Sequence, residues 1–210
     1  MTRDHLRLPA STEFKLGAHV GRFSSAVILA LIPEYPVFVV EEIPNYHYVG
    51  DGEIELSGLT TVEWGELVVR TWRSYAGKEA RCTALVDPDT QFSKEMARCK
   101  LRLRKNVNHG PELRCEVTRE YFHDNKIFLM PWLTVLPSEI SSARWPPEES
   151  SAYKVRATGR DYTLLALEQV ICRRPVAKAV EKPAISHWVE QRIRDNGGNI
   201  RKTDRHLGNS

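Results

Sequence analysis

The feature that most constrains the fold is an alternation of strand-sized apolar runs with amphipathic helices along the 210 residues. Residues 25–32 and 37–42 are apolar runs joined by a proline-bearing connection, which predicts two antiparallel strands of a hairpin. The strand-like run 14–20 leads into the first of them. Further short runs predict strands at 83–86, 101–104 and 127–130.

Helix patterns separate these runs. Apolar residues recur at steps of three and four from Trp64 to Tyr75, after a cap at Thr60 or Thr61 and before a stop at Gly77. Segment 44–58 is polar, and we expect a loop or a weak strand there. Further helices are expected at 91–99, 111–122, 138–143, 161–173 and, short and amphipathic, 184–194. This order predicts an α/β fold with a mixed sheet flanked by helices.

Composition limits the classes of protein that the chain can belong to. It is 41% hydrophobic and 27% charged, which is typical of a globular domain. We expect one domain over residues 1–178, followed by a basic and partly disordered tail over 179–210. No run approaches the roughly 20 apolar residues of a membrane span, and no signal peptide opens the sequence, so we expect a cytoplasmic protein. The four cysteines form no CxxC pair, and no P-loop is present.

Two acids stand where chemistry is expected. Asp87 ends the apolar run 83–86, a position that faces the ligand crevice in open α/β sheets, and Asp89 follows it. Asp161 opens the last expected helix. A turn and a helix cap are the default explanations of these residues when each is taken alone. Taken together, two carboxylates at the starts of elements indicate a site for hard divalent cations.

Basic residues gather between the two acids. They are a solvated face or a contact for nucleic-acid phosphates, and net charge does not decide, since it is only +3. His109 follows in a loop and has the same two interpretations. The residues expected to bind DNA are Arg98, Arg102, Arg104, Lys105 and His109.

The segment 84–175 resembles the nuclease domain of phage terminase large subunits, the packaging motors of tailed viruses. Val86-Asp87-Pro88 resembles the second acidic site of that family, and Asp161, five residues before Ala166, resembles the acid of its last helix. The elements between them run in the family's order. The resemblance implies a ribonuclease-H-like fold and Mg²⁺- or Mn²⁺-dependent cleavage of duplex DNA by a two-metal mechanism. Implied partners are a packaging ATPase in the same or a separate chain, the portal and the terminase small subunit, in the host cytoplasm.

One departure concerns the first acid of the family, which is an Asp between two glycines on the opening strand. Here the matching residues are Gly17-Ala-His19-Val-Gly21, so His19 stands in its place. A ligating histidine is neutral and favours softer ions than Mg²⁺. Glu41 and Glu42, which end the run 37–42, are the expected substitute acids, and Asp89 is a further candidate. Tyr162 and Leu165 also replace polar residues of the family's last helix.

These departures leave two alternatives. The first is a catalytically degenerate member of the fold that serves as a DNA-binding or assembly module, and His19 is its main support. The second is another ribonuclease-H-like nuclease, such as a junction resolvase, because fold alone does not select the substrate.

Overall fold

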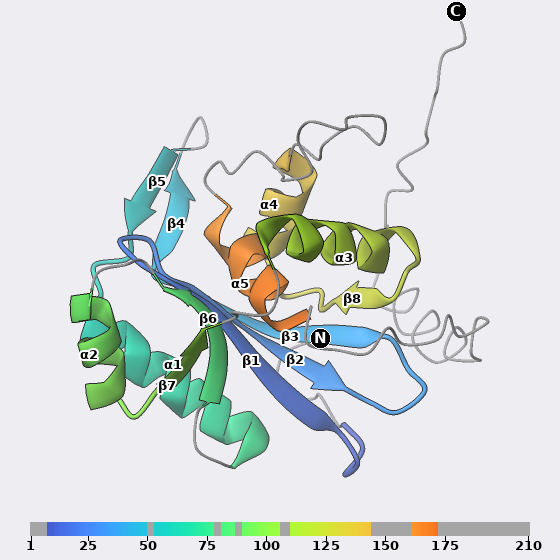
Figure 1. The fold of residues 1–210 in the computed structure, drawn as a ribbon, viewed down its shortest axis with the longest axis horizontal. Coiled ribbons are helices and arrows are strands. Elements are labelled where there is room, and N and C mark those ends of the chain that lie inside the picture. The colour runs from blue at the N-terminus through green and yellow to red at the C-terminus, as the bar shows by residue number, and fades with distance from the viewer. Residues whose placement is uncertain are drawn as a thin grey trace, which may run out of the picture.

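A computed structural model describes residues 8–49, 53–77, 81–86, 90–105, 110–143 and 161–171 of the chain. Its centre is a six-stranded sheet with the strand order β7-β6-β1-β2-β3-β8 (Figure 1). The flanking helices make the fold α/β, which confirms the predicted class. The strands are β1 Glu13–Val20, β2 Ser25–Leu31, β3 Val37–Pro44, β6 Arg81–Val86, β7 Arg102–Lys105 and β8 Ile127–Leu129.

Among these six strands, β2 alone runs against the others. It pairs antiparallel with β1 and β3, whereas β6 is parallel to β1, β7 is parallel to β6 and β8 is parallel to β3. The other five strands therefore point the same way, and their carboxyl ends lie at one edge of the sheet. Ligands of open α/β sheets bind outside this edge.

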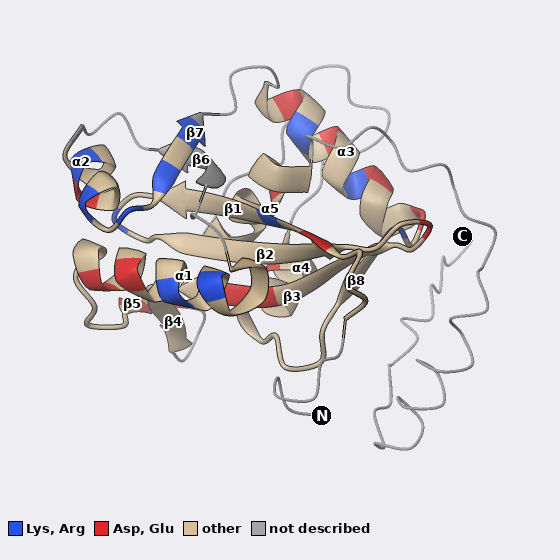
Figure 2. Cartoon of the chain, turned by 90° about the horizontal axis from the view of Figure 1, so that it is seen from below, with Lys and Arg blue, Asp and Glu red and all other residues tan. Residues whose placement is uncertain are grey.

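Helices cover both faces of the sheet (Figure 2). Helices α1 Thr61–Ala76 and α2 Thr90–Arg98 pack on what we call the α1 face, over a core that contains Trp64 and Met96. The other face, the α5 face, carries α3 Pro111–His123, α4 Val135–Ser142 and α5 Tyr162–Ile171. In the described part of the chain, no helix combines the length and apolar character needed to cross a bilayer.

Helix α1 follows its sequence pattern closely. The Thr60 hydroxyl accepts the Glu63 N–H, and the Glu63 carboxylate accepts the Thr60 N–H, which completes a capping box. Gly77 ends the helix in the left-handed region at φ 61°. Trp64 is fully buried, and its ring N–H donates to the Ile43 carbonyl at 2.8 Å. The prediction of a buried stripe is therefore confirmed.

Two segments differ from their predictions. Where a loop or weak strand was expected, β4 Tyr46–Val49 and β5 Glu53–Leu56 form a separate antiparallel hairpin. Helix α4 begins at Val135, three residues earlier than predicted, because a carboxylate on β3 caps its first turn. The loop 144–151, the helix 184–194 and the boundary between domain and tail lie outside the described residues.

Helix α5 approaches β1 very closely at Gly17. A Cβ at this position would stand 2.4 Å from the Ala166 carbonyl oxygen and 2.7 Å from a methyl carbon of Val170. A side chain at residue 17 would therefore push the helix away from the sheet, since packed interiors leave no room for added atoms. This glycine allows the first turn of α5 to lie at the carboxyl end of β1.

We expect Gly17→Ser to destabilise the protein by about 1–3 kcal/mol or more, the usual cost of overpacking. The same change at Gly110 makes a matched control. Nothing lies within 4 Å of a Cβ there, and this N-cap of α3 has no side-chain hydrogen bond. Serine would supply one, so we expect Gly110→Ser to raise stability by roughly a few tenths of a kcal/mol. Urea unfolding measures both changes, and equal effects would contradict the close approach.

Candidate functional site

The carboxyl ends of β1 and β6 meet beside the start of β2. His19, the next-to-last residue of β1, pairs with Ser25 of β2 and with Leu85 of β6. Strand β6 ends at Val86, opposite Val20, and Asp87 is the next residue of the sequence. Asp87, Asp89 and His109 lie outside the described residues, so their expected roles remain predictions.

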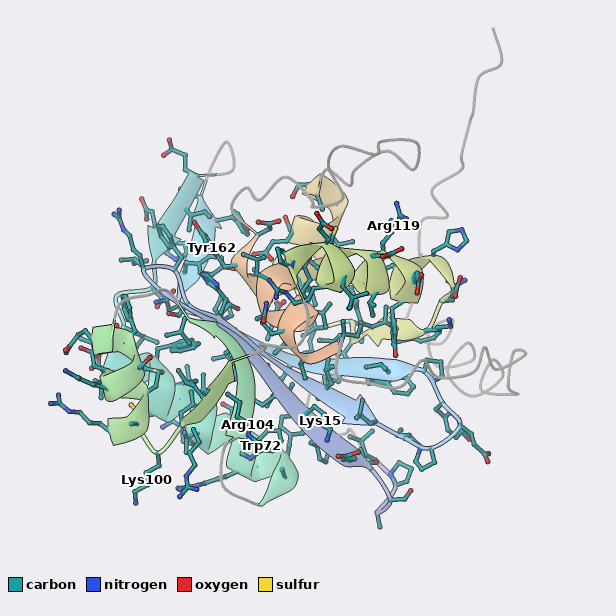
Figure 3. All side chains as sticks on the ribbon, in the orientation of Figure 1. Lys15, Trp72, Lys100, Arg104, Arg119 and Tyr162 are labelled. Carbon is teal, nitrogen blue, oxygen red and sulfur yellow. The ribbon has the colours of Figure 1, made fainter. Side chains whose placement is uncertain are left out.

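The His19 side chain lies on the α5 face, as does position 17, because side chains two apart on a strand share a face. Its ring stacks on Tyr162, with centroids 5.2 Å apart and 23° between the planes. Phe23 also stacks on Tyr162, at 5.3 Å and 22°, and the Arg22 guanidinium lies 5.4 Å from the Phe23 centroid. Tyr162, labelled in Figure 3, therefore joins the histidine to the turn between β1 and β2.

Asp161 precedes α5 at the same edge of the sheet. It is only 5% exposed, and its carbonyl oxygen accepts the Leu165 N–H at 3.0 Å, which makes it the N-cap residue. Two residues later, the Thr163 hydroxyl oxygen lies 2.8 Å from that of Ser25 on β2. The structure thus brings His19 and the start of α5 to one end of the sheet.

A buried carboxylate on α4 holds this first turn. Glu139, 1% exposed, accepts the Leu164 N–H at 2.7 Å and the hydroxyls of Tyr46 and Tyr48 at 2.6 and 3.0 Å. The Thr163 N–H donates to the Tyr46 hydroxyl oxygen at 3.1 Å. Burial raises the pKa of Glu139, although these hydrogen bonds oppose the shift. Burial and the neighbouring Glu139 also raise the pKa of Tyr46.

Sequence reasoning missed Glu139 and Tyr46. They lie 93 residues apart, and Glu139 is 25 residues from Leu164, so no local pattern links them. One weak signal exists. Glu139 follows the buried Leu136 by three residues, where the stripe of a helix calls for an apolar side chain. A buried acid at such a position needs polar partners from elsewhere in the fold.

Glu41 does not meet His19. It pairs with Ile28, whose side chain belongs to the core under α1, and it accepts a hydrogen bond from the Tyr75 hydroxyl at 3.3 Å. Because directly paired residues share a face, Glu41 lies on the α1 face, on the other side of the sheet from His19. The expectation that Glu41 substitutes for the missing acid is therefore not supported by its position.

Glu42 lies on the α5 face, but its carboxylate has a different task. It caps helix α4, where unpaired N–H groups and the helix dipole favour an anion. The bonds are short, at 2.6, 2.8 and 2.7 Å, and the donors are the backbone N–H groups of Thr134, Val135 and Leu136. This cap explains why α4 begins early and gives Glu42 a structural role.

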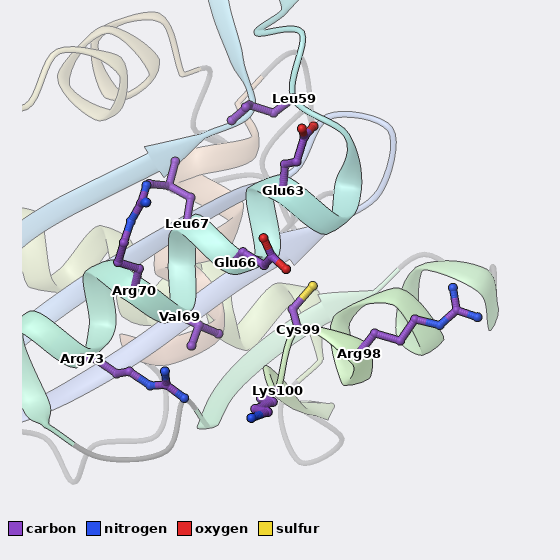
Figure 4. A pocket seen from close by; sticks show the side chains of 10 residues that line it. All are labelled: Leu59, Glu63, Glu66, Leu67, Val69, Arg70, Arg73, Arg98, Cys99 and Lys100. Atoms are coloured by element: carbon purple, nitrogen blue, oxygen red, sulfur yellow. The ribbon is translucent and has the colours of Figure 1, made fainter.

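The arginines expected to bind DNA divide between the two faces. Leu103 packs against the core under α1, so its exposed neighbours Arg102 and Arg104 point to the α5 face. Arg98 instead lines a groove of about 670 Å³ beside α1 and α2 (Figure 4). The other cations around this groove are Arg70, Arg73 and Lys100. Nothing is described of the Lys105 side chain.

The donors at the sheet edge fit a metal ion only in part. Within the described residues, no three His, Cys, Asp or Glu side chains group as a metal site. The described donors are the carboxylate of Asp161 and the imidazole of His19, and a hard divalent cation requires more oxygen ligands than these. Asp87, directly after β6, is the residue that would complete the set.

The raised pKa of Glu139 predicts a pH dependence. Between the ordinary carboxyl pKa of 4.5 and the raised one, the folded state keeps a proton that the unfolded state has lost. Over that window the free energy of unfolding therefore decreases as pH rises. We expect the decrease to be smaller in Glu139→Gln, which cannot titrate, when urea unfolding of both proteins is measured across the window. An identical slope would contradict the shift.

No family model matches the sequence, and no curated protein matches it. Solved structures do, over 79–80% of the chain. The large terminase nuclease of thermophilic phage G20c has 12% identity and a TM-score of 0.55 over 85% of its chain, and it has also been solved with bound magnesium, with a TM-score of 0.51. The large terminase of a second thermophilic bacteriophage has 13% identity and a TM-score of 0.54, over 42% of its chain. The P22 large terminase nuclease domain has 10% identity and a TM-score of 0.52, over 90% of its chain. The chain therefore has the ribonuclease-H-like fold of phage large terminase nuclease domains.

Proposed function

We propose that the chain is a metal-dependent endonuclease domain that cleaves duplex DNA during viral genome packaging. The observation that carries this proposal is the buried Asp161 at the start of α5, beside the carboxyl end of β1, in a fold shared with phage terminase nucleases. Open α/β sheets bind their ligands at the carboxyl ends of the parallel strands, and carboxylate oxygens are the ligands that hard divalent cations take, which makes this position a candidate for a metal ligand.

Asp87 and Asp161 would hold Mg²⁺ or Mn²⁺ through carboxylate oxygens, with His19 as a third ligand. When bound, such ions activate water and stabilise charge on the attacking and leaving oxygens of a phosphodiester. The magnesium-bound G20c nuclease supports the choice of ion. The chain itself orients Asp161, because the first turn of α5 is fixed to β2 through Thr163 and Ser25. A second ion would need a further carboxylate.

His19 bears on which ion the site prefers. An imidazole in place of a carboxylate removes one negative charge and favours first-row ions over Mg²⁺. Its ring also stacks on Tyr162, which fixes its plane. We therefore expect Mn²⁺ to support more activity than Mg²⁺.

Duplex DNA would lie across the α5 face. Arg102 and Arg104 project on this face from the edge strand β7, where a phosphate backbone can reach them. Lys105, His109 and the basic tail would add contacts. The other proposed partners are a packaging ATPase, in the same or a separate chain, the portal and the terminase small subunit, in the host cytoplasm. The chain spans 42% of the full large terminase from the second thermophilic phage, so these whole-motor partners belong to the proposal.

A second candidate function is a degenerate module that binds DNA without cutting it. The observation that favours it is the stack of His19 on Tyr162, since an aromatic contact is a sufficient structural reason for the histidine. Cleavage of a four-way junction in preference to linear duplex would instead favour a resolvase.

Asp161→Asn should lower Mn²⁺-supported cleavage of plasmid DNA by about 100-fold or more, because it removes a charged metal ligand while keeping the size of the side chain. Asp87→Asn should do the same. Asp124→Asn is the matched control, because Asp124 is a surface acid at the end of α3 that pairs with Lys126. Gel assays of nicking measure all three.

Full cleavage by both site variants would refute the nuclease proposal. No cleavage by the wild-type protein in Mn²⁺ or Mg²⁺, together with retained DNA binding, would support the degenerate module. In that case a gain of activity in His19→Asp would identify the histidine as the cause.

Neutralising Arg102 or Arg104 tests where the DNA lies. Each Arg→Gln change should weaken binding of a duplex oligonucleotide and reduce the slope of log affinity against log salt by about 0.9 for each phosphate that is no longer bound. Arg70→Gln and Arg73→Gln, at the groove on the α1 face, should leave the slope unchanged. Fluorescence anisotropy at several salt concentrations measures this slope. A larger reduction from the α1-face pair would show that the DNA lies on that face instead.

A further inference from the structure

The groove beside α1 and the end of α2 carries positive charge that no ion pair neutralises. Its volume is about 670 Å³, and it lies on the α1 face, away from the candidate metal site (Figure 4). Within the described part of the chain, none of its four cationic side chains makes an ion pair, and all four are exposed. These cations are Arg70 and Arg73 of α1, Arg98 at the end of α2, and Lys100.

The charges are spread along the groove. Glu63, Glu66, Arg70 and Arg73 follow one another at steps of three and four, so they lie along one side of α1. The acids occupy its amino half and the arginines its carboxyl half. The side chains of Arg70 and Arg98 extend in different directions (Figure 4). This arrangement suits an extended segment with several anionic groups better than it suits one compact anion.

The other residues of the groove favour a polypeptide over a nucleic acid. Leu59, which is 36% exposed, and Leu67 offer apolar contacts that a sugar-phosphate backbone does not use. The Glu66 carboxylate lines the same groove and would repel phosphates. Surfaces that bind DNA are usually much more uniformly positive. The fitting partner is therefore a protein segment that carries acidic side chains and an apolar one.

Strand β5 of this chain is a segment of that kind. Glu53, Glu55 and Leu56 are all exposed, Leu56 to 46%. The two glutamates lie on one face of the strand, because side chains two apart share a face. Glu53 makes no ion pair within the described residues, and the described partner of Glu55 is the exposed His47, at 3.6 Å. The acids of β5 are thus accessible to another molecule.

Strand β5 does not meet the cations of its own groove. It is paired along its length with β4, and the hydroxyls of Tyr46 and Tyr48 hold β4 to α4. Only residues 57–60 separate β5 from α1, so the hairpin lies at the amino end of that helix. Arg73 lies ten residues beyond Glu63, which is roughly 15 Å along the helix. An acidic strand in the groove must therefore come from a second molecule.

We propose that β5 of one molecule docks in the groove of a second copy of this chain. Glu53 and Glu55 face the arginines of the groove, and Leu56 packs against Leu59 and Leu67 of the other copy. Because the hairpin and the groove adjoin on each molecule, a two-fold axis can place each hairpin in the groove of the other, which closes a dimer. This contact goes beyond the proposed nuclease function and does not depend on it.

Sedimentation velocity of the full chain over a series of concentrations tests for the dimer. Exposed ion pairs contribute little singly and are screened by salt, so we expect a dimer that depends on concentration and weakens as salt rises from about 0.05 M to about 0.5 M. A chain that is monomeric at every concentration would overturn the proposal.

Charge reversal then tests the surfaces. The hairpin variant carries Glu53→Arg and Glu55→Arg, and the groove variant carries Arg70→Glu and Arg73→Glu. Each variant alone places like charges opposite one another, so each should weaken its own dimer by about 10-fold or more. An equal mixture of the two should dimerise, because the hairpin of each variant then meets a groove of opposite charge. Recovery of the dimer would also show that both variants are folded, whereas a monomeric mixture would contradict the proposed contact.

Two controls complete the experiment. Glu116→Arg with Glu120→Arg changes the net charge as the hairpin variant does, from exposed positions on α3, and should leave the dimer unchanged. An equal loss there would show a general effect of charge and overturn the proposal. Asp161→Asn should dimerise like the wild type, so a failed cleavage assay does not bear on the dimer. Loss of duplex DNA binding by the groove variant, together with a monomeric mixture, would show that the groove takes DNA instead.

Discussion

The hydrogen bonds between Glu139 and the first turn of α5 are the interaction on which the rest of the site depends. They fix a short helix at its amino end, where a helix has unsatisfied N–H groups, and they do so from inside the protein. Asp161, Tyr162 and Thr163 all take their positions from this turn. The stack on His19 and the bond to Ser25 then attach the turn to the sheet. A buried carboxylate on α4 thereby helps to set the positions of Asp161, Tyr162 and Thr163.

A carboxylate also caps helix α4, the helix that carries Glu139. Glu42 on β3 caps α4 through three backbone N–H groups, and α4 carries Glu139. The sheet therefore fixes one helix, and that helix fixes the next, each time by a carboxylate at a helix start. Such bonds are favourable because the charge meets both the helix dipole and real N–H donors. The arrangement fixes the start of each short helix in addition to the packing of its buried residues.

The sequence supported most of the sheet and much less of the site. Helix α1 was predictable because its cap, its stripe and its stop are all local, from Thr60 to Gly77. The strands β1, β2 and β3 were predictable from their apolar runs. The hairpin β4–β5 was not, because Tyr46 and Tyr48 are held by a residue more than 90 positions away. Glu41 and Glu42 looked equivalent in the sequence, but strand alternation sends them to opposite faces. Asp161 was recognisable as a candidate from its place at the start of a helix. The hydrogen bonds that cap this helix were not recognisable, because their acceptors come from α4 and β4.

Gly17 has a consequence for comparing distant sequences. At 10–13% identity to the solved structures, the sequence offers few landmarks for alignment. The space at Gly17 is limited by the carbonyl oxygen of Ala166. Because this is a backbone atom, the limit does not depend on which side chains form the candidate site. A chain that keeps this helix at this depth needs a glycine there even when its catalytic groups have changed. This residue therefore marks the register of the opening strand, and its presence reports that the architecture persists without reporting whether an activity does.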